Sequence, residues 1–463
     1  MINNINIGGK VIASGGFGCV FNPALRCETD TNRAKNKISK LMTEKHAIKE
    51  YNEIITIKKK LENIKNYHDY FLIYDTSLCK PAFLSEQDLN DYDSKCKALS
   101  KIKITKSNIN NNLDALLSLN IPNGGLPVDD YMYNNGSVEK MYQVHVSLMK
   151  LLKKGIIPMN KRNVYHCDIK DQNVVIDENV TSKLIDWGMT IDYIPFKNEP
   201  FPTTFKNRPL QFNVPFSVIL FSNSFIEKYT QFLKNGGKPT KIELKPFVID
   251  YISSWMKERG YGHYRFINEI MYELFSHSIN TVPKDKKPQM IETQITMNFI
   301  INYIIDVLTH FTKFGDNVVL NLRDYLDKVF LKIVDIWGFI SIYFVFIEIL
   351  FNNYHKLTPK YIEVFNKLKY IFIEYLYNPR HEVININELY SDLQDLEKLL
   401  FTRSLQKNKK YKIKNIKNIK NKTVKKNKTV KDLGKGLKTI KNKTIIFKRL
   451  PKKQRFKNPF YKL

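Results

Sequence analysis

The sequence predicts an α+β protein with two lobes, a small β-rich lobe followed by a large α-helical one. Residues 9–21 alternate apolar and small side chains around a glycine cluster, which is typical of strands joined by a tight turn. From about Phe225 onward, apolar residues recur instead at the 3.6-residue spacing of helices. The third observation is the basic, low-complexity stretch 403–463. It holds too little apolar surface to offset its ordering entropy, which predicts a disordered C-terminal tail.

The 463-residue chain has a formal net charge of +29, and most of this charge lies at one end. Residues 401–463 hold 24 basic side chains and one acidic side chain, so the other 400 residues are nearly neutral at +6. Basic, disordered extensions bind phosphate backbones or anionic surfaces by releasing counterions. We therefore expect the tail to bind nucleic acid or an anionic surface, the alternative being a solvated end without a specific partner.

The cysteines indicate reduced thiols rather than a disulfide framework. Their number is odd, and none has the paired spacing of metal ligands. The first residues also lack the basic-then-apolar pattern of a signal peptide. These observations predict an intracellular protein, and the thiols concerned are Cys19, Cys27, Cys79, Cys96 and Cys167.

Two further elements follow the glycine cluster in the first lobe. Residues 38–42 form a short run typical of a strand, and residues 43–61 have helical spacing with Thr43 as the expected N-terminal cap. Residues 80–112 are rich in Asn and Lys, which predicts a polar insertion or a long surface loop.

The second lobe begins with an amphipathic helix over residues 137–154. Two β-like runs follow at 173–177 and 183–186, each ending on a polar cluster. The apolar run 336–347 is too short to span a bilayer, so we expect a buried core helix and no membrane span. The apolar face of the first helix consists of Val138, Met141, Val144, Leu148 and Leu151, and further helical spacing occurs at 291–314, 318–351, 359–377 and 388–401.

The glycine cluster lies in the segment Ala13-Ser-Gly-Gly-Phe-Gly-Cys-Val20. Glycines allow a backbone to approach phosphates closely, although a tight hairpin needs them equally. A dinucleotide-binding loop would open a helix, whereas here the residues after the glycines look like a returning strand and Pro23 blocks a helix.

Two charged residues accompany this loop. Lys40 lies in a strand-like context, and Glu53 lies on the helical segment that follows. Each alone is most simply a solvated surface charge. Together, downstream of a glycine hairpin, they can form an ion pair that holds a lysine over phosphates.

The strongest signal is the segment Tyr-His-Cys-Asp-Ile-Lys-Asp-Gln-Asn over residues 165–173. Its Asp168, Lys170 and Asn173 lie between a helix and a strand, where they can surround one phosphoryl group. Asp186 follows at the end of the second β-like run, before Trp and Gly. A carboxylate in that position is well placed to bind Mg²⁺.

This set of motifs resembles the protein-kinase family. That family has a glycine-rich loop, a strand lysine, a helix glutamate, a His-Arg-Asp loop with Asn, and Asp-Phe-Gly. The forms found here, His-Cys-Asp and Asp-Trp-Gly in an Asn-, Ile- and Lys-rich chain, are similar to serine/threonine kinases of large cytoplasmic DNA viruses. The resemblance covers roughly residues 8–400 and is strong at 13–20 and 163–188.

The resemblance implies a bilobal protein-kinase-like fold with ATP and Mg²⁺ as cofactors and protein Ser/Thr hydroxyls as acceptors. Lys40 would reach the α- and β-phosphates and pair with Glu53. The loop over the phosphates would comprise Ala13, Gly15, Gly16, Gly18 and Val20.

The resemblance also assigns roles to the 165–173 segment. Asp168 would accept the proton of the substrate hydroxyl, and Lys170 would steady the γ-phosphate. Asn173 and Asp186 would hold Mg²⁺. Positioning and charge neutralisation would then supply most of the rate.

Several positions depart from the family pattern. Ala13 replaces the first loop glycine. Cys167 replaces the arginine that responds to a phosphorylated activation loop in the family. We therefore expect control by activation-loop phosphorylation to be absent. No Ala-Pro-Glu follows Asp186, and residues 208–215 occupy its place.

The resemblance also sets the expected boundaries. Asp335 would belong to the central buried helix of the second lobe and steady the catalytic loop. Because Asp335 comes about 149 residues after Asp186, a helical insertion is expected at about 225–330. Residues 119–125 resemble the hinge, which divides the chain into 1–123, 124–402 and the tail at 403–463.

Alternative functions remain open at this point. One is a small-molecule kinase of the aminoglycoside or choline type, which shares His-x-Asp with a later Asn. Another is a pseudokinase scaffold with a nucleic-acid-binding tail. The viral resemblance implies a location in the host cytoplasm, at a viral factory, or in the virion. The tail threonines, which are candidate targets of the kinase itself, are Thr423, Thr429, Thr439 and Thr444.

Overall fold

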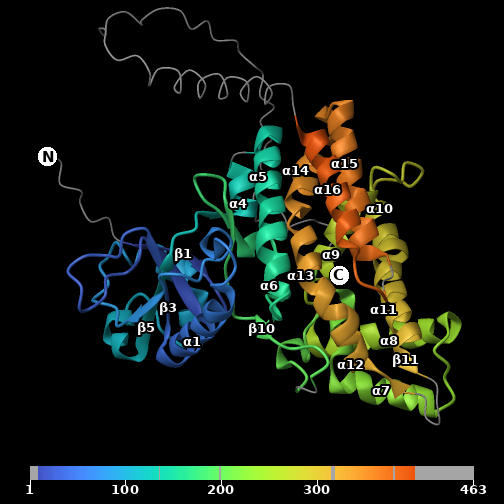
Figure 1. The fold of residues 1–463 in the computed structure, drawn as a ribbon, viewed down its shortest axis with the longest axis horizontal. Helices are drawn as coiled ribbons and strands as arrows, with labels where there is room; N and C mark the ends of the chain where they lie inside the picture. The colour runs from blue at the N-terminus through green and yellow to red at the C-terminus, as the bar shows by residue number, and fades with distance from the viewer. Residues whose placement is uncertain (1–8, 135, 198–199, 314–318, 379–380, 402–463) are drawn as a thin grey trace, which may run out of the picture.

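The computed structural model describes residues 9–134, 136–197, 200–313, 319–378 and 381–401. Within these ranges the chain has a mixed α+β architecture, with the main sheet near the N-terminus and helices through the rest (Figure 1). The predicted basic tail, 403–463, and its threonines lie outside the described residues.

The N-terminal part is built on an antiparallel five-stranded sheet with the order β1-β2-β3-β5-β4. Helix α1 (Glu44–Leu61) follows β3 directly and buries Ala47, Ile54 and Ile57. Thr43 lies at the predicted N-cap position, but its side chain makes no capping hydrogen bond. The strands are β1 (Lys10–Ser14), β2 (Gly18–Asn22), β3 (Lys37–Thr43), β4 (Ser77–Cys79) and β5 (Leu116–Pro122).

The prediction of a surface loop over residues 80–112 is wrong. This segment forms the short helices α2 (Tyr92–Lys95) and α3 (Lys97–Ser100), which lie against β1 and β2. Its apolar residues are few, but most of them are buried and build a second core with Val11, Phe21 and Leu41, while Phe83 and Ile102 are exposed. The apolar residues of the segment in this core are Leu84, Leu89, Tyr92, Ala98, Leu99, Ile104 and Ile109.

The prediction of reduced thiols is also wrong for four of the five cysteines. Cys19 is bonded to Cys96, and Cys27 to Cys79, with Cα atoms 5.3 and 5.7 Å apart. Cys167 is free and buried. The bonded partners lie 77 and 52 residues apart in the chain, so the pairs form only through the fold: residues 80–112 bring Cys96 to Cys19 on β2, and β4 carries Cys79 to Cys27.

Residues 123–125 carry the chain from the sheet into the helical part. The expected hinge, 119–125, is therefore partly strand, because β5 extends to Pro122. Gly125 has φ +97°, and a Cβ there would collide with the carbonyl oxygen of Ile176, so the connection requires glycine. The small strands beyond it are β6 (Leu126–Pro127), β7 (Val164–Tyr165), β8 (Val174–Ile176), β9 (Ser182–Leu184), β10 (Ile191–Asp192), β11 (Thr312–Lys313) and β12 (Val319–Leu320).

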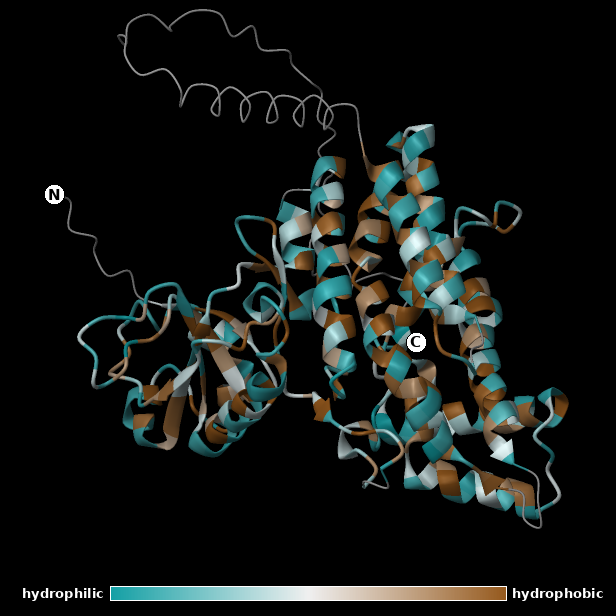
Figure 2. Cartoon of the chain, in the orientation of Figure 1, coloured by the Kyte–Doolittle hydropathy of each residue, from teal (hydrophilic) through white to brown (hydrophobic). Residues whose placement is uncertain are grey.

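Helices make up most of the remaining chain, and Figure 2 shows apolar and polar residues alternating along α5. The amphipathic helix predicted at 137–154 is confirmed as α5, where Ser137 Oγ accepts a hydrogen bond from Lys140 N (3.2 Å) and all five apolar positions are buried. The helices are α4 (Val128–Asn134), α5 (Val138–Leu151), α6 (Ile157–Asn160), α7 (Asn223–Lys234), α8 (Lys241–Arg259), α9 (Tyr264–Phe275), α10 (Lys287–Met290), α11 (Met297–Phe311), α12 (Leu322–Tyr325), α13 (Leu331–Ser341), α14 (Phe344–Asn352), α15 (Pro359–Phe372) and α16 (Ile386–Leu400).

The apolar run around α13 and α14 forms the centre of the helical part. Over the described residues, 322–352 is the one helical stretch long and apolar enough to cross a membrane, and its apolar window is wholly buried in the protein. A buried core helix, as predicted, fits this burial better than a membrane span. Trp337 on α13 packs edge-on against Tyr303 of α11, with ring centroids 5.5 Å apart, so the 225–330 region shares this core.

Candidate active site

Helix α13 anchors the His166–Asn173 loop through the side chain of Asp335. The carboxylate of Asp335 accepts hydrogen bonds from the backbone N–H groups of His166 (2.9 Å) and Cys167 (2.8 Å). Burial raises the pKa of Asp335 to about 7, against the opposing effect of these two donors. The expectation that Asp335 steadies this loop is thus matched by two direct hydrogen bonds.

Four side chains converge on the carboxylate of Asp168. Lys170 Nζ (2.8 Å) and Asn173 Nδ2 (2.9 Å) donate to Oδ2. Asn213 Nδ2 (2.9 Å) and an Arg208 guanidinium nitrogen (3.3 Å) donate to Oδ1. Burial alone would raise the pKa of Asp168, but these cations and amides outweigh it and hold the pKa below its ordinary value. The carboxylate is therefore ionised at neutral pH.

Arg208 and Asn213 were not predicted as site residues. From the sequence, residues 208–215 are identified only as the segment that stands where Ala-Pro-Glu is expected. No role follows for the side chain of either residue. Arg208 is almost fully buried and also donates to the carbonyl oxygen of Cys167 (2.8 Å). It thus brings a guanidinium to the loop that carries Cys167. Nothing in the local sequence marks an arginine 40 residues downstream as a partner of Asp168. Only the three-dimensional contact identifies it.

A β-hairpin brings Asn173 and Asp186 to one end. Strands β8 and β9 pair with Val174 opposite Leu184, and Ile185 N donates to the carbonyl oxygen of Asn173 (3.0 Å). Asp186 follows at once with a left-handed backbone (φ 63°). The amide oxygen of Asn173 and the carboxylate of Asp186 are oxygen donors of the kind that Mg²⁺ prefers.

The glycine segment forms the turn of the β1–β2 hairpin, so a strand follows it, as predicted. Gly15 N donates to the carbonyl oxygen of Gly18 (2.9 Å), which closes the turn. A Cβ on Gly15 would lie 3.8 Å from Cε of Lys40, so the turn lies over that lysine. The register explains this placement, because Val20 of β2 stands opposite Lys40 of β3 and Ala13 opposite Val20. Gly16 has open space around it.

The expected pairing of Lys40 with Glu53 is wrong. Lys40 Nζ lies 2.7 Å from both carboxylate oxygens of Glu50, while Glu53 lies 3.8 Å from Lys49. Burial raises the pKa of Glu53. Glu50 and Glu53 are three residues apart on α1, about 4.5 Å along its axis. The helical pattern alone could not decide which of the two glutamates reaches β3.

The segment between α1 and β4 contacts the hairpin directly through Tyr70 and Leu72. Leu72 N donates to the carbonyl oxygen of Leu184 (3.0 Å), and Leu184 N donates to that of Tyr70 (2.8 Å). These bonds lie two residues before Asp186, so the N-terminal part is joined to the hairpin at its Asp186 end. No family model matches the chain, and a comparison with curated proteins finds no similar sequence.

Proposed function

We propose that this protein is an ATP-dependent protein kinase that transfers the γ-phosphoryl group to Ser or Thr hydroxyls of protein substrates. The observation that carries the proposal is the cluster around Asp168, in which Lys170 and Asn173 both lie within 2.9 Å of one carboxylate oxygen. The strand-rich N-terminal part and the helical remainder are the order expected of a bilobal, protein-kinase-like fold.

In this proposal Asp168 accepts the proton of the substrate hydroxyl, because its carboxylate is ionised and held by four donors. Lys170 holds the γ-phosphate, and Lys40, fixed by Glu50, holds the α- and β-phosphates. Asn173 and Asp186 are the residues that would hold Mg²⁺, and bound Mg·ATP would supply the phosphoryl group and neutralise its developing charge.

The glycine turn completes the nucleotide site in this proposal. Its backbone N–H groups can approach phosphates because Gly15, Gly16 and Gly18 carry no Cβ. A Cβ on Gly18 would lie 2.7 Å from the carbonyl oxygen of Leu41, so glycine is also required there for the sheet to pack.

The test is phosphorylation of a generic protein acceptor with radiolabelled ATP. Asp168→Asn should lower the rate by about 10²–10⁴-fold, since it removes the proton acceptor and keeps the side-chain shape. Asp192→Asn, which changes an exposed carboxylate on β10, is the matched control and should act like wild type.

Three outcomes would count against this proposal. Label on a small alcohol or an aminoglycoside, with no protein labelled, would indicate a small-molecule kinase. An Asp168→Asn variant as active as wild type would refute the assigned mechanism, and failure of the wild type to bind Mg·ATP in a thermal-shift titration would indicate a pseudokinase scaffold.

A further inference from the structure

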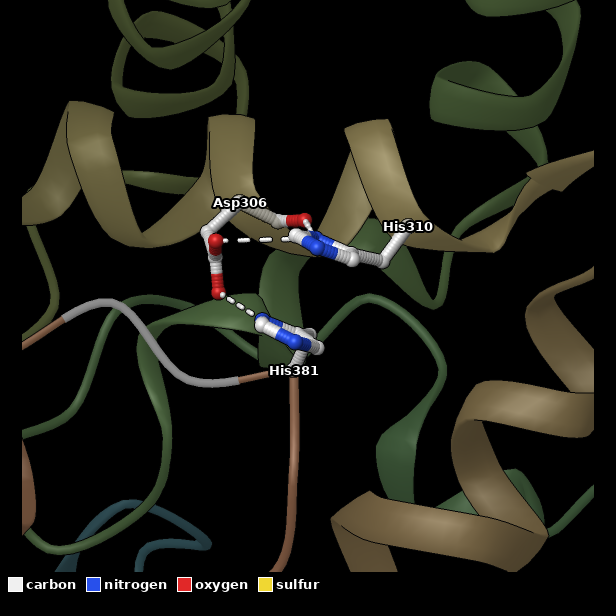
Figure 3. A group of neighbouring side chains, drawn as sticks. All are labelled: Asp306, His310 and His381. Atoms are coloured by element: carbon white, nitrogen blue, oxygen red, sulfur yellow. Dashed lines mark hydrogen bonds and ion pairs between the residues drawn. The ribbon is translucent and has the colours of Figure 1, made fainter.

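Three metal-ligating side chains meet on α11, in a region to which the proposed kinase reaction assigns no role. Asp306 and His310 lie one turn apart on this helix, and His381 comes from the segment before α16 (Figure 3). Nδ1 of His381 lies 3.1 Å from one oxygen of Asp306, and Nδ1 of His310 lies 3.5 Å from the other. Both rings thus face one carboxylate.

The potential ligand atoms lie close together, although not yet at the spacing of a bound ion. Zn²⁺ binds imidazole nitrogen and carboxylate oxygen at about 2.0–2.2 Å in tetrahedral geometry, which puts neighbouring ligand atoms about 3.3–3.5 Å apart. The two Asp306–histidine distances, 3.1 and 3.5 Å, are near this spacing for each histidine separately, but they end on different oxygens of the carboxylate. One potential ligand atom from each residue lies within 4.8 Å of the other two.

The two imidazole rings lie face to face, with centroids 3.3 Å apart and planes within 3° of parallel. Because the lone pair of a ring nitrogen lies in the plane of its ring, binding of one ion by both histidines requires one ring to rotate out of this stack. His310 and His381 are 42% and 36% exposed and Asp306 is 18% exposed, so an ion from solvent can reach all three. The carboxyl of Glu382, 3.7 Å from Nε2 of His381, lies at the edge of the group.

We propose that Asp306, His310 and His381 form a binding site for a divalent transition-metal ion of the Zn²⁺ class. Two imidazoles and one carboxylate suit such ions, whereas Mg²⁺ and Ca²⁺ prefer all-oxygen sites. The ion joins α11 to the segment that leads into α16. This site is separate in sequence and ligand chemistry from the oxygen donors Asn173 and Asp186.

A simpler arrangement competes with this proposal. Nδ1 of His310 also lies 2.8 Å from the backbone carbonyl oxygen of Asp306, so the group can be read as a hydrogen-bonded cluster that needs no metal. In that case the side chains stabilise the fold directly. The two arrangements differ in what Zn²⁺ does to the protein, and this difference is measurable.

The experiment uses the full chain, stripped of metal with a chelator and dialysed, and titrated with Zn²⁺ in a calorimeter. Wild type should bind one equivalent. His310→Ala and His381→Ala should weaken this binding by about 10–100-fold, and Asp306→Asn should do so while keeping the side-chain shape. His355→Ala, which removes an exposed histidine elsewhere, should bind as wild type does. Mg²⁺ should not compete for the site.

Melting temperatures give the second readout. With chelator present, His381→Ala should have the same melting temperature as the wild type. Added Zn²⁺ should raise the melting temperature of the wild type but not that of the variant. If His381→Ala melts lower in chelator and Zn²⁺ changes neither protein, the cluster is a hydrogen-bonded one and the proposal is overturned. Unchanged Zn²⁺ affinity in both histidine variants would overturn it as well.

Discussion

The two halves of the candidate site contain lysine–carboxylate pairs of nearly equal length in unlike surroundings. Lys170 and Asp168 lie 2.8 Å apart among Arg208, Asn213 and the backbone of the loop. Lys40 and its glutamate lie 2.7 Å apart beside a glycine turn whose tip, Phe17, is 61% exposed. Both pairs are partly buried, with Lys170 20% and Lys40 16% exposed, but the first pair belongs to a network of four donors around Asp168, whereas the second joins β3, the central strand of the sheet, to α1.

This difference has an energetic consequence. Inside a protein, a hydrogen bond is stronger and an unpaired polar group is more costly than at the surface. We therefore expect changes in the 166–173 loop to lower stability and activity together. Changes around Lys40 should lower activity with a smaller effect on stability, because they break one partly buried ion pair rather than several hydrogen bonds to one carboxylate.

The largest effect is expected from Asp335→Ala. The two backbone donors of the loop, on His166 and Cys167, would lose their charged acceptor in a fully buried place. At about 1.5–3 kcal/mol for each hydrogen bond to a charged group, the free energy of unfolding should fall by about 3–6 kcal/mol. Urea unfolding measures this, with Lys332→Ala on the exposed side of α13 as the control. Equal midpoints for the two variants would contradict the anchoring role of Asp335.

A pH effect of somewhat smaller size follows from the same carboxyl. The pKa of Asp335 is about 7 in the folded chain, against an ordinary value of 3.8, so the folded state holds one more proton between these pH values. The stability that this group contributes is full below about pH 4 and is lost as pH rises towards 7. The free energy of unfolding of wild type relative to Asp335→Asn should therefore fall by up to about 4 kcal/mol across this window. A constant difference between the two proteins from pH 4 to 7 would show that Asp335 titrates normally.

Arg208→Met should reduce stability by about 2–3 kcal/mol, because a buried carboxylate loses one of its charged donors. The pKa of Asp168 lies below its ordinary value, so its ionisation stabilises the fold above about pH 4, and this contribution is lost as pH falls. The variant should thus differ more from wild type at pH 7 than at pH 3. Arg265→Met, at an exposed arginine on α9, is the control. A larger difference at pH 3 would argue against a charge contact with Asp168.

The sequence predicts well what depends on neighbouring residues. The glycine hairpin, the helix at 138–151, the strand after Asn173 and the strand before Asp186 all follow from local spacing and side-chain type. The contacts that it misses are long-range. Arg208 reaches Asp168 across 40 residues, and Cys96 reaches Cys19 across 77, so both depend on how the elements pack. The 80–112 core is missed because its apolar residues are diluted by Asn and Lys without a regular period.

Local spacing does not decide which glutamate pairs with Lys40. Substituting these glutamates gives the smallest expected change in stability. Glu50→Gln and Glu53→Gln are matched substitutions three residues apart on α1. Glu53→Gln should change the free energy of unfolding by less than about 1 kcal/mol, since Glu53 is 40% exposed. Glu50→Gln should lower it by about 1.5 kcal/mol, since the Lys40–Glu50 pair is only 16% and 18% exposed. If the kinase proposal holds, only Glu50→Gln should lower kcat/KM for ATP, by about tenfold, because it alone releases Lys40.

The reverse result would be equally informative. A loss of activity in Glu53→Gln with Glu50→Gln unaffected would mean that α1 turns or slides when nucleotide binds, so that Lys40 exchanges one glutamate for the next. That exchange costs only one ion pair at Lys40, where the second glutamate, Glu53, is 40% exposed. Around Asp168 the same exchange would break several hydrogen bonds to one carboxylate and leave a charge unpaired, which is why the geometry there should be the same with and without nucleotide.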